Sequence, residues 1–254
     1  MELIDTHTHL FDKAFDKDRK DAIKAAIDEG VTKFYLPNID EHTLTHVEDL
    51  HNDFPKHCFP MYGLHPCSVK ANYEDQLKSI EKWLGSHETW GIGETGIDLY
   101  WDKSLKKEQI HAFQWHIHKA IEFQKPLIIH CRESMDLVIE VVKKKNHPDL
   151  KGIFHCFTGD VNQAKQIIDM GFKLGIGGVL TFKNSGLDKT IKEISPEHLV
   201  LETDSPYLAP TPHRGKRNES GYLPIIAQKL ADIKEMPLEE VARITTKNAK
   251  SLFD

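Results

Sequence analysis

The chain has 254 residues, of which 39% are hydrophobic and 28% charged, and its formal net charge is −6. This composition is typical of a globular protein with a sizeable core, and the length suits one barrel of eight strand–helix units, which takes about 250 residues. The negative charge excludes a protein that binds nucleic acid by phosphate neutralisation over a broad surface, because proteins of that class are usually basic.

Eight hydrophobic runs divide the chain, and each ends in a polar or glycine-rich tip. The runs are Leu3–Leu10, Lys33–Pro37, Cys58–His65, Trp90–Glu94, Pro126–His130, Gly152–His155, Phe172–Gly178 and Leu199–Asp204. Their tips are separated by the length of one strand followed by one helix, which is longer than the spacing of strands in an all-β sandwich. Several runs are almost continuously apolar, as are parallel strands that are buried on both faces.

Between the runs, apolar residues recur at three- and four-residue steps, which is the period of one helix face. Such faces are Ile110, Phe113, Ile117 and Ile121, then Leu137, Val138, Val141 and Val142, and finally Val241, Ile244, Ala249 and Leu252 after Pro237. Alternating strands and helices without a break in composition predict a single α/β domain over residues 1–254. Eight repeats favour closure into a (β/α)8 TIM barrel, and an open sheet of seven or eight strands is the alternative.

Six of the eight tips carry side chains of the kinds that bind metal ions. These side chains are His7, His9, His65, Glu94, His130, His155 and Asp204. Because the carboxyl ends of parallel strands meet at one end of a barrel, the pattern predicts a metal centre there. His7 and His9 are two residues apart, so on a strand both rings point to the same face and can reach one ion.

Glu94 lies within Gly91–Gly96, where three glycines let the backbone pass close to a neighbour or a ligand, and a carboxylate there can bridge two cations. His130 and His155 end the fifth and sixth runs, although either one alone is more often a buried core histidine than a ligand. Arg132 stands two residues after His130, on the same side of the strand. Its guanidinium can clamp phosphate or carboxylate oxygens, and a salt bridge to a neighbouring acid is the alternative.

Asp204 closes the eighth run, where a carboxylate can bind one metal ion and also accept a proton from attacking water. Glu202 shares its face but lies deeper, so we interpret it as a support of the site or as a structural residue. His65 ends the third run and is a candidate to contact the substrate or the leaving group.

The longest irregular stretch, residues 205–221, follows the last predicted strand, and a loop of this length is usually functional. It carries Arg214, Lys216 and Arg217, which are candidates to bind phosphates that flank the reacting one. The sequence has no G-x-S-x-G elbow, no G-x-x-x-x-G-K-[ST] loop and no G-x-G-x-x-G motif. Serine-hydrolase, P-loop and dinucleotide-binding chemistry are therefore not favoured.

Five motifs spread over the chain resemble, in sequence and in order, those of the TatD-type metal-dependent deoxyribonucleases of the amidohydrolase superfamily. They are IDTHTHL, GETGIDLYW, IIHCRES, HCFTG and LETDSPYLAP, and the RGKRNES loop and the closing KNAKSLF are similar as well. The resemblance implies a barrel with two divalent metal ions (Mg, Mn or Zn) at its C-terminal face. It implies further that one ion is held by His7, His9 and Asp204 and the other by His130 and His155, with Glu94 as the bridge.

The sequence departs from this pattern in two places. The family's loop commonly reads Asn-Glu-Pro, whereas this chain has Asn218, Glu219, Ser220 and Gly221. That change concerns the rigidity of the loop and the choice of substrate rather than the metal ligands. The carbamylated lysine that bridges two metals in other members of the superfamily is also absent, since Glu94 occupies the fourth run. A urease-like or dihydroorotase-like site is therefore not expected.

The resemblance implies a hydrolase that cleaves phosphodiester bonds of DNA from the 3′ end with water activated by the metal ions. Its DNA would be single-stranded or a duplex end. Asp204 and Glu94 would be catalytic, and the substrate contacts would be Arg132, His65, Arg214 and Arg217. Two alternatives stay open. The same ligands could serve hydrolysis of a carbonyl ester or amide, such as a lactone or a misacylated tRNA, or the barrel could be an inactive metal-binding scaffold.

The location and assembly of the protein are predicted from weaker signals. The four cysteines form no CxxC pair, and no apolar stretch approaches the ~18–20 residues of a membrane span. Residues 1–10 include an aspartate and two histidines, which a signal peptide would not. We expect a cytoplasmic protein and favour a monomer.

Overall fold

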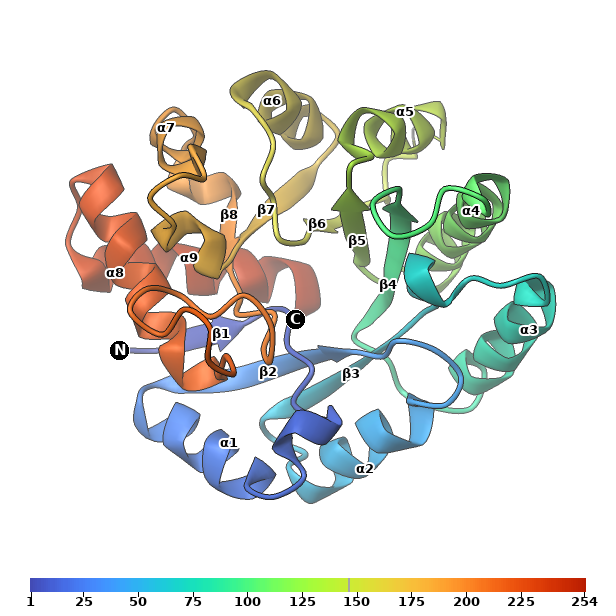
Figure 1. The fold of residues 1–254 in the computed structure, drawn as a ribbon, viewed down its shortest axis with the longest axis horizontal. Helices are drawn as coiled ribbons and strands as arrows, with labels where there is room; N and C mark the ends of the chain where they lie inside the picture. Colours follow the sequence, from blue (N-terminus) through green and yellow to red (C-terminus); the bar gives the residue numbers. More distant parts are fainter. Residues whose placement is uncertain (146) are drawn as a thin grey trace.

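The structure, a computed structural model, describes residues 1–145 and 147–254. Its parallel strands form one sheet in which each strand pairs with the next strand of the chain (Figure 1). The strands are β1 (Leu3–Asp5), β2 (Val31–Pro37), β3 (Cys58–Tyr62), β4 (Gly91–Asp98), β5 (Leu127–Arg132), β6 (Gly152–Phe154), β7 (Phe172–Ile176) and β8 (Leu199–Leu201). β8 returns to the side of β1, so the sheet rolls into the predicted barrel and the open sheet is excluded.

Helices surround the barrel and connect successive strands (Figure 1). They are α1 (Arg19–Asp28), α2 (Leu44–Asp53), α3 (Tyr73–Leu84), α4 (Lys106–Phe123), α5 (Met135–Lys145), α6 (Val161–Asp169), α7 (Leu187–Lys192), α8 (Leu223–Lys234) and α9 (Leu238–Phe253). The three helix faces predicted from apolar spacing are confirmed: α4 buries Phe113 and Ile117, α5 buries Val138, and α9 buries Val241.

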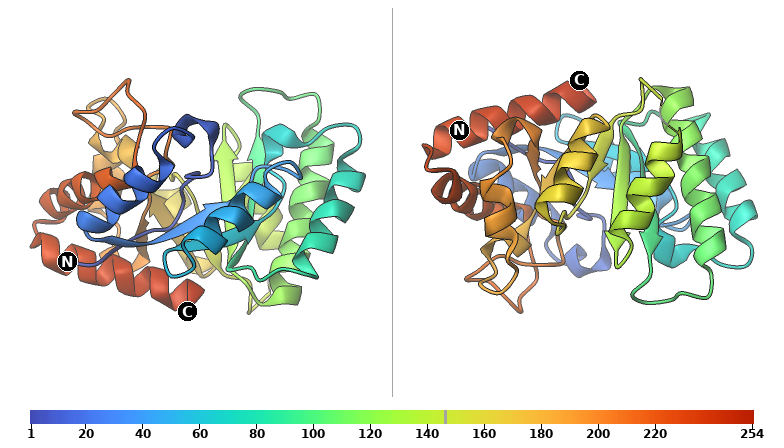
Figure 2. Two further views of the ribbon diagram at one scale, coloured as in Figure 1. Left: turned by 90° about the horizontal axis from the view of Figure 1, so that it is seen from below. Right: turned by 90° about the horizontal axis from the view of Figure 1, so that it is seen from above.

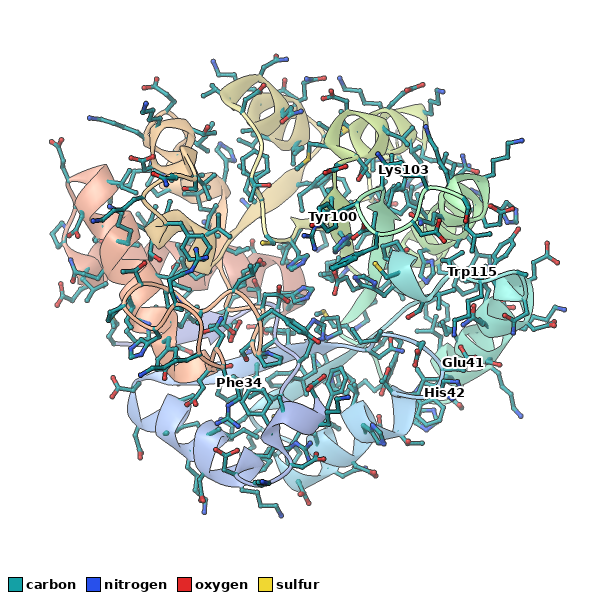
Figure 3. All side chains as sticks on the ribbon, viewed as in Figure 1. Phe34, Glu41, His42, Tyr100, Lys103 and Trp115 are labelled. Carbon is teal, nitrogen blue, oxygen red and sulfur yellow. The ribbon has the colours of Figure 1, made fainter. Side chains whose placement is uncertain are left out.

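The core has two parts, one between the sheet and the outer helices and one inside the barrel. Phe34, labelled in Figure 3, is fully buried in the outer part. The inner part comprises Ile4, Tyr35, Met61, Ile128, Ile153 and Val200 from the strands with Ala249, Leu252 and Phe253 from α9. The ring of Phe253 stacks on that of Tyr35, with 3.7 Å between centroids. Helix α9 thus closes one end of the barrel (Figure 2), and a site for ligands must open at the other.

The seam between β1 and β8 is closed by residues at and just beyond the strand ends. The backbone N–H of Thr6 donates to the carbonyl of Leu201 at 3.1 Å. The buried carboxylate of Asp5 accepts hydrogen bonds from the backbone N–H of Thr203 at 2.9 Å and from its hydroxyl at 2.6 Å. The predicted first and last strands are therefore too long, since β1 ends at Asp5 and β8 at Leu201. The predicted ligands His7, His9 and Asp204 lie on the segments that follow.

Strand β4 is longer than the predicted run, and it lies unusually close to β5. Gly96 pairs in register with His130, and its φ of 143° is one that residues with a side chain rarely adopt. A Cβ at Gly96 would collide with the carbonyl oxygen of His130. A Cβ at Gly93 would lie 2.5 Å from the carbonyl oxygen of Ile128. The interpretation that these glycines permit close backbone approach is confirmed.

Within the described residues, no helix combines the length and the apolar character that crossing a membrane requires.

Replacing Gly96 by Ala tests this close approach. The added methyl group must displace the backbone of β5 and strain the backbone of β4, so we expect unfolding free energy to fall by about 2–5 kcal/mol. Urea denaturation followed by circular dichroism measures the change. Gly85→Ala is the matched control, because Gly85 has a helical φ of −73° and its Cβ would meet only ordinary contacts, the nearest at 3.6 Å. Equal losses in the two variants would show that the approach of β4 to β5 is not constrained.

Candidate metal centre

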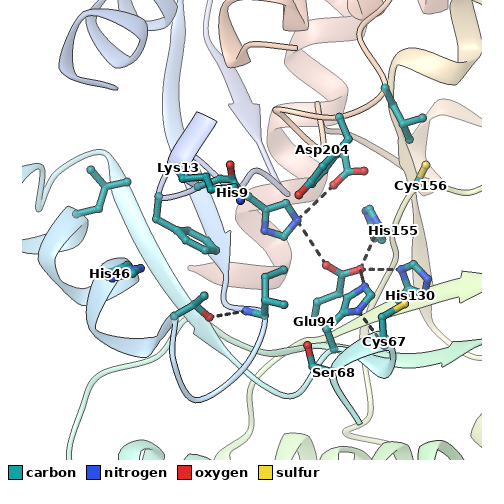
Figure 4. Close-up of a pocket in the computed structure, with 18 of the residues that line it drawn as sticks. His9, Lys13, His46, Cys67, Ser68, Glu94, His130, His155, Cys156 and Asp204 are labelled. Carbon is teal, nitrogen blue, oxygen red and sulfur yellow. Dashed lines mark hydrogen bonds and ion pairs between the residues drawn. The ribbon is translucent and has the colours of Figure 1, made fainter. Parts of the chain in front are cut away.

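The side chains predicted to bind metal converge at the open end of the barrel, although they come from six segments. Figure 4 shows His9, Glu94, His130, His155 and Asp204 pointing toward one another. They line a pocket with a volume of about 1790 Å³. Two more predicted residues complete the group. His7 lies just after β1, and His65 lies in the connection between β3 and α3.

Glu94 is the centre of this group, and its two carboxylate oxygens face different histidines. Oε2 lies 3.0 Å from Nε2 of His7 and 3.6 Å from Nε2 of His9. Oε1 lies 2.9 Å from Nδ1 of His130 and 3.3 Å from Nε2 of His155. The carboxylate therefore separates two groups of ring nitrogens. This is the arrangement in which one carboxylate can bridge two cations.

His7 and His9 reach one point even though they lie beyond the end of β1. Their Nε2 atoms are 3.3 Å apart, and the carboxylate oxygen Oδ1 of Asp204 is 3.7 Å from the first and 3.4 Å from the second. The strand geometry expected for this pair is wrong, but the expected convergence of the two rings is observed. Asp204 has a φ of 56°, a left-handed conformation that is strained for most residues and that Asp tolerates better than most.

Hydrogen bonds on the far side of the rings orient three of these histidines. Nε2 of His130 bonds to Oδ2 of Asp98 at 3.0 Å, and Nδ1 of His155 bonds to Oε1 of Glu202 at 3.0 Å. Nδ1 of His9 bonds to the carbonyl of Pro37 at 3.2 Å. Each bond fixes which nitrogen carries the proton and leaves the other free to bind, as carboxylates and carbonyls do around metal-ligating histidines. The expected supporting role of Glu202 agrees with this contact.

Electrostatics keep the central carboxylates ionised. Burial alone would raise the pKa of the Glu94 carboxyl, but the histidines around it, His7 first among them, hold that pKa well below its usual range. Burial also opposes ionisation of Asp204, but His9, His155 and His7 together outweigh burial, so the pKa of Asp204 is lowered. Both groups are anionic at neutral pH and available as ligands.

The same field raises the pKa of some of the histidines, whereas the pKa of others is lowered. Burial lowers the pKa of His155, but the carboxylates of Glu202 and Glu94 outweigh burial and raise that pKa to about 10. At His7, burial and the neighbouring His155 lower the pKa. The pocket therefore stabilises positive charge near Glu94, whether that charge is carried by protons or by bound cations.

The donor set fits divalent metal ions. Ligand atoms of three combinations lie within 4.8 Å of one another, namely His7 with His9 and Glu94, His7 with His155 and Asp204, and His65 with Glu94 and His130. Imidazole nitrogens combined with carboxylate oxygens suit zinc and manganese, and the carboxylates also suit magnesium.

The predicted substrate contacts fall into two groups. Arg132 and His65 line the same pocket as Glu94. Nε2 of His65 is 3.4 Å from Oε1 of Glu94. Arg132 is exposed, and its guanidinium lies 3.9 Å from the centroid of the Tyr100 ring. The alternative of a salt bridge at Arg132 is not observed within residues 1–145 and 147–254.

Arg214 and Arg217 lie on the β8–α8 loop, outside the residues that line the pocket. The guanidinium of Arg214 stacks on Phe182 at 3.6 Å. Arg217 donates to both oxygens of Asp18 at 2.7 Å and to Glu219 at 2.9 Å, so it ties this loop to the start of α1. A phosphate that binds Arg217 must compete with these acids.

Sequence reasoning missed Asp98, which holds His130 and also accepts hydrogen bonds from the backbone N–H groups of Tyr100 and Trp101, at 2.9 and 3.2 Å. A signal was present, because Asp98 is four residues after Glu94 and strand alternation puts both on the same face. It was hidden by the prediction that the strand ends at Glu94. Asn218 was missed as well, and its side-chain N–H groups donate to the carbonyls of Thr203 and Tyr207.

Comparison with known proteins agrees with the geometry. The sequence model of the family described as TatD related DNase matches residues 4–254. The chain belongs to this family. The resemblance seen in the motifs is thereby confirmed, and the protein is a metal-dependent hydrolase of the TatD family.

Two relatives and one solved structure show how far the similarity extends. The chain is 38% identical over 252 residues to YabD of Bacillus subtilis, an uncharacterized metal-dependent hydrolase, covering 99% of this chain and 98% of that protein. It is 31% identical over 260 residues to the 3'-5' ssDNA/RNA exonuclease TatD of Salmonella typhimurium, covering 99% of both chains. The crystal structure of YjjV, a TatD homolog from Escherichia coli K12, superposes with a TM-score of 0.93 at 25% identity, covering 99% of this chain and 97% of that one.

Asp98→Asn tests how the site is supported. An amide has a single acceptor oxygen and cannot serve both His130 and the backbone of the following loop, so we expect metal affinity to fall about 10- to 100-fold. Calorimetric titration of metal-stripped protein with Mn²⁺ or Zn²⁺ measures the affinity. Asp102→Asn, an exposed change in the same loop, is the control and should leave it unaltered. An Asp98→Asn protein with full metal affinity would show that Asp98 does not support the metal centre.

Proposed function

We propose that this protein is a divalent-metal-dependent phosphodiesterase that removes nucleotides from the 3′ end of DNA, either single-stranded or at a duplex end. The observation that carries the proposal is the position of Glu94 between two groups of ring nitrogens, with one carboxylate oxygen facing each group. Two cations bridged by a carboxylate are suited to a phosphodiester, whose attacked and departing oxygens both need stabilisation. The exonuclease relative from Salmonella typhimurium supports the same substrate.

The two groups of ring nitrogens around Glu94 support two ions rather than one. His7, His9 and Asp204 would hold the first together with Oε2 of Glu94, and His130 and His155 would hold the second together with Oε1. Divalent cations bound there supply Lewis acidity toward a phosphate oxygen and make a water molecule more acidic.

Asp204 is the residue best placed to take the proton from the attacking water. Its side chain is 14% exposed, whereas that of Glu94 is 2% exposed, so Asp204 is the one that meets the open pocket. Its lowered pKa keeps it ionised and able to accept a proton. Glu94 is enclosed by histidines. It would contribute to catalysis by holding the ligands on both sides in place.

Arg132 and His65 are placed to bind the phosphate and the leaving oxygen. Both line the pocket beside His130, and the His65 and His130 rings are 4.6 Å apart between centroids. A guanidinium can pair with two phosphate oxygens at once and so offset the charge that develops during cleavage. Arg214 and Arg217, farther out on the β8–α8 loop, would contact flanking phosphates, Arg217 only after releasing Asp18.

A labelled oligonucleotide tests the proposal. Metal-stripped protein is given a 3′-labelled single-stranded DNA together with Mg²⁺, Mn²⁺ or Zn²⁺, and release of the labelled mononucleotide is followed over time. We expect release with at least one of these metals and a loss of about 10²- to 10⁴-fold in kcat for Asp204→Ala, the range that a general base contributes.

Asp169→Ala, an exposed change at the end of α6, is the matched control and should keep full activity. Failure to cleave with any of the three metals, in protein shown to bind them, would refute the nuclease proposal. The same protein would then be tested on a lactone and on an aminoacyl ester, which the same ligands could serve.

A further inference from the structure

Exposed aromatic and large aliphatic side chains gather at the mouth of the pocket. Large hydrophobic residues that are exposed in the described part of the chain are Met1, Tyr100, Trp101, Tyr207 and Leu208. Trp101, at 69% exposure, Tyr207 and Leu208 all line the pocket that holds Glu94. Tyr100 packs edge-on against Trp101, with 4.9 Å between ring centroids. Tyr100 and Trp101 thus form an exposed aromatic cluster at the rim of a polar site, which indicates a binding surface.

Arg132 connects this cluster to the predicted phosphate position. Its guanidinium lies 3.9 Å from the ring centroid of Tyr100 and 5.3 Å from that of Trp101. These contacts hold the guanidinium against the two rings, and its N–H groups remain free to meet an anion, since within the described residues it has no carboxylate partner. A group that binds phosphate and a group that binds a flat apolar ring therefore stand side by side.

Asp98 fixes the distance between the aromatic rings and the metal centre. One of its oxygens accepts from the backbone N–H groups of Tyr100 and Trp101, and the other bonds to Nε2 of His130. The loop after β4 and the proposed metal ligand thus share one carboxylate. Figure 3 shows Tyr100 toward the mouth of the barrel, with Lys103 and Trp115 farther out. The backbone that carries the two rings is therefore tied to the site.

We propose that Trp101, backed by Tyr100 and Arg132, is a stacking platform for an unpaired nucleobase next to the scissile phosphate. This inference rests on the proposed nuclease function and assigns to it a residue that determines specificity. A base beside a phosphate supplies a flat apolar face that can cover the exposed surface of Trp101. Stacking tolerates any base because every base has a π face. A paired terminal base has its faces covered by its neighbours, so a duplex end must fray before it can bind.

Binding without turnover tests the platform directly. In an Asp204→Ala background, tryptophan fluorescence is titrated with a short oligodeoxyadenylate and with the same strand carrying abasic sugars at its 3′ end. We expect quenching by the strand with bases and about 10-fold weaker binding of the abasic strand. Because variants of Trp101 lack the reporting tryptophan, their binding is followed by the fluorescence anisotropy of dye-labelled strands. Trp101→Ala should reduce the ratio to near one, and Trp101→Phe, which keeps a ring, should restore part of it. Trp115→Phe, on α4 beside Lys119, should preserve both the quenching and the ratio.

Hydrolysis separates this inference from the nuclease proposal. In Asp204-intact protein, the ratio of kcat/KM for the two strands should fall from about 10 to near one in Trp101→Ala. An unchanged ratio in that variant, or no difference between the strands in the original protein, overturns the platform even if both strands are cleaved. Trp101-dependent binding of bases without hydrolysis of either strand supports the platform and refutes the nuclease activity instead.

Discussion

The buried carboxylate of Glu94 is the constraint on which the rest of this site depends. A carboxylate that is 2% exposed must be compensated by positive charge, because desolvation of an unpaired anion is costly. The compensation comes from imidazoles on several segments, and Asp98, Glu202 and the carbonyl of Pro37 orient three of those rings from behind. Such a centre accepts cations readily, since they can replace the charge that protons carry on the rings. Metal dependence follows from this balance of buried charges.

The barrel serves this centre through two local features. At the seam, Asp5 and Thr203 join the ends of β1 and β8, which brings His7 and Asp204 to the same point although neither lies on a strand. Between β4 and β5, glycines allow an approach so close that no side chain would fit, and Glu94 thereby meets His130. Helix α9 fills the opposite end with apolar side chains, so the polar residues are confined to one opening.

Much of this could be predicted from sequence, because the barrel and the ligand positions depend on period and spacing. The eight runs indicated the strands, and their tips indicated the residues that converge. The ends of the strands were harder to predict. β1 and β8 stop early because hydrogen bonds across the seam between them replace the regular strand pairing. β4 continues to Asp98 because its glycines do not interrupt it. The pairing of Arg217 with Asp18 depends on segments far apart in sequence, and no local pattern reveals it. The stacking of Arg132 on Tyr100 and Trp101 was likewise visible only in three dimensions.

The most direct test of the central claim is a crystal structure of the protein soaked in Mn²⁺, with data collected to locate manganese by its anomalous scattering. We predict two peaks, one on each side of Glu94, with His7, His9 and Asp204 around the first and His130 and His155 around the second. A single peak that touches only one oxygen of Glu94, or ions bound away from this carboxylate, would contradict it.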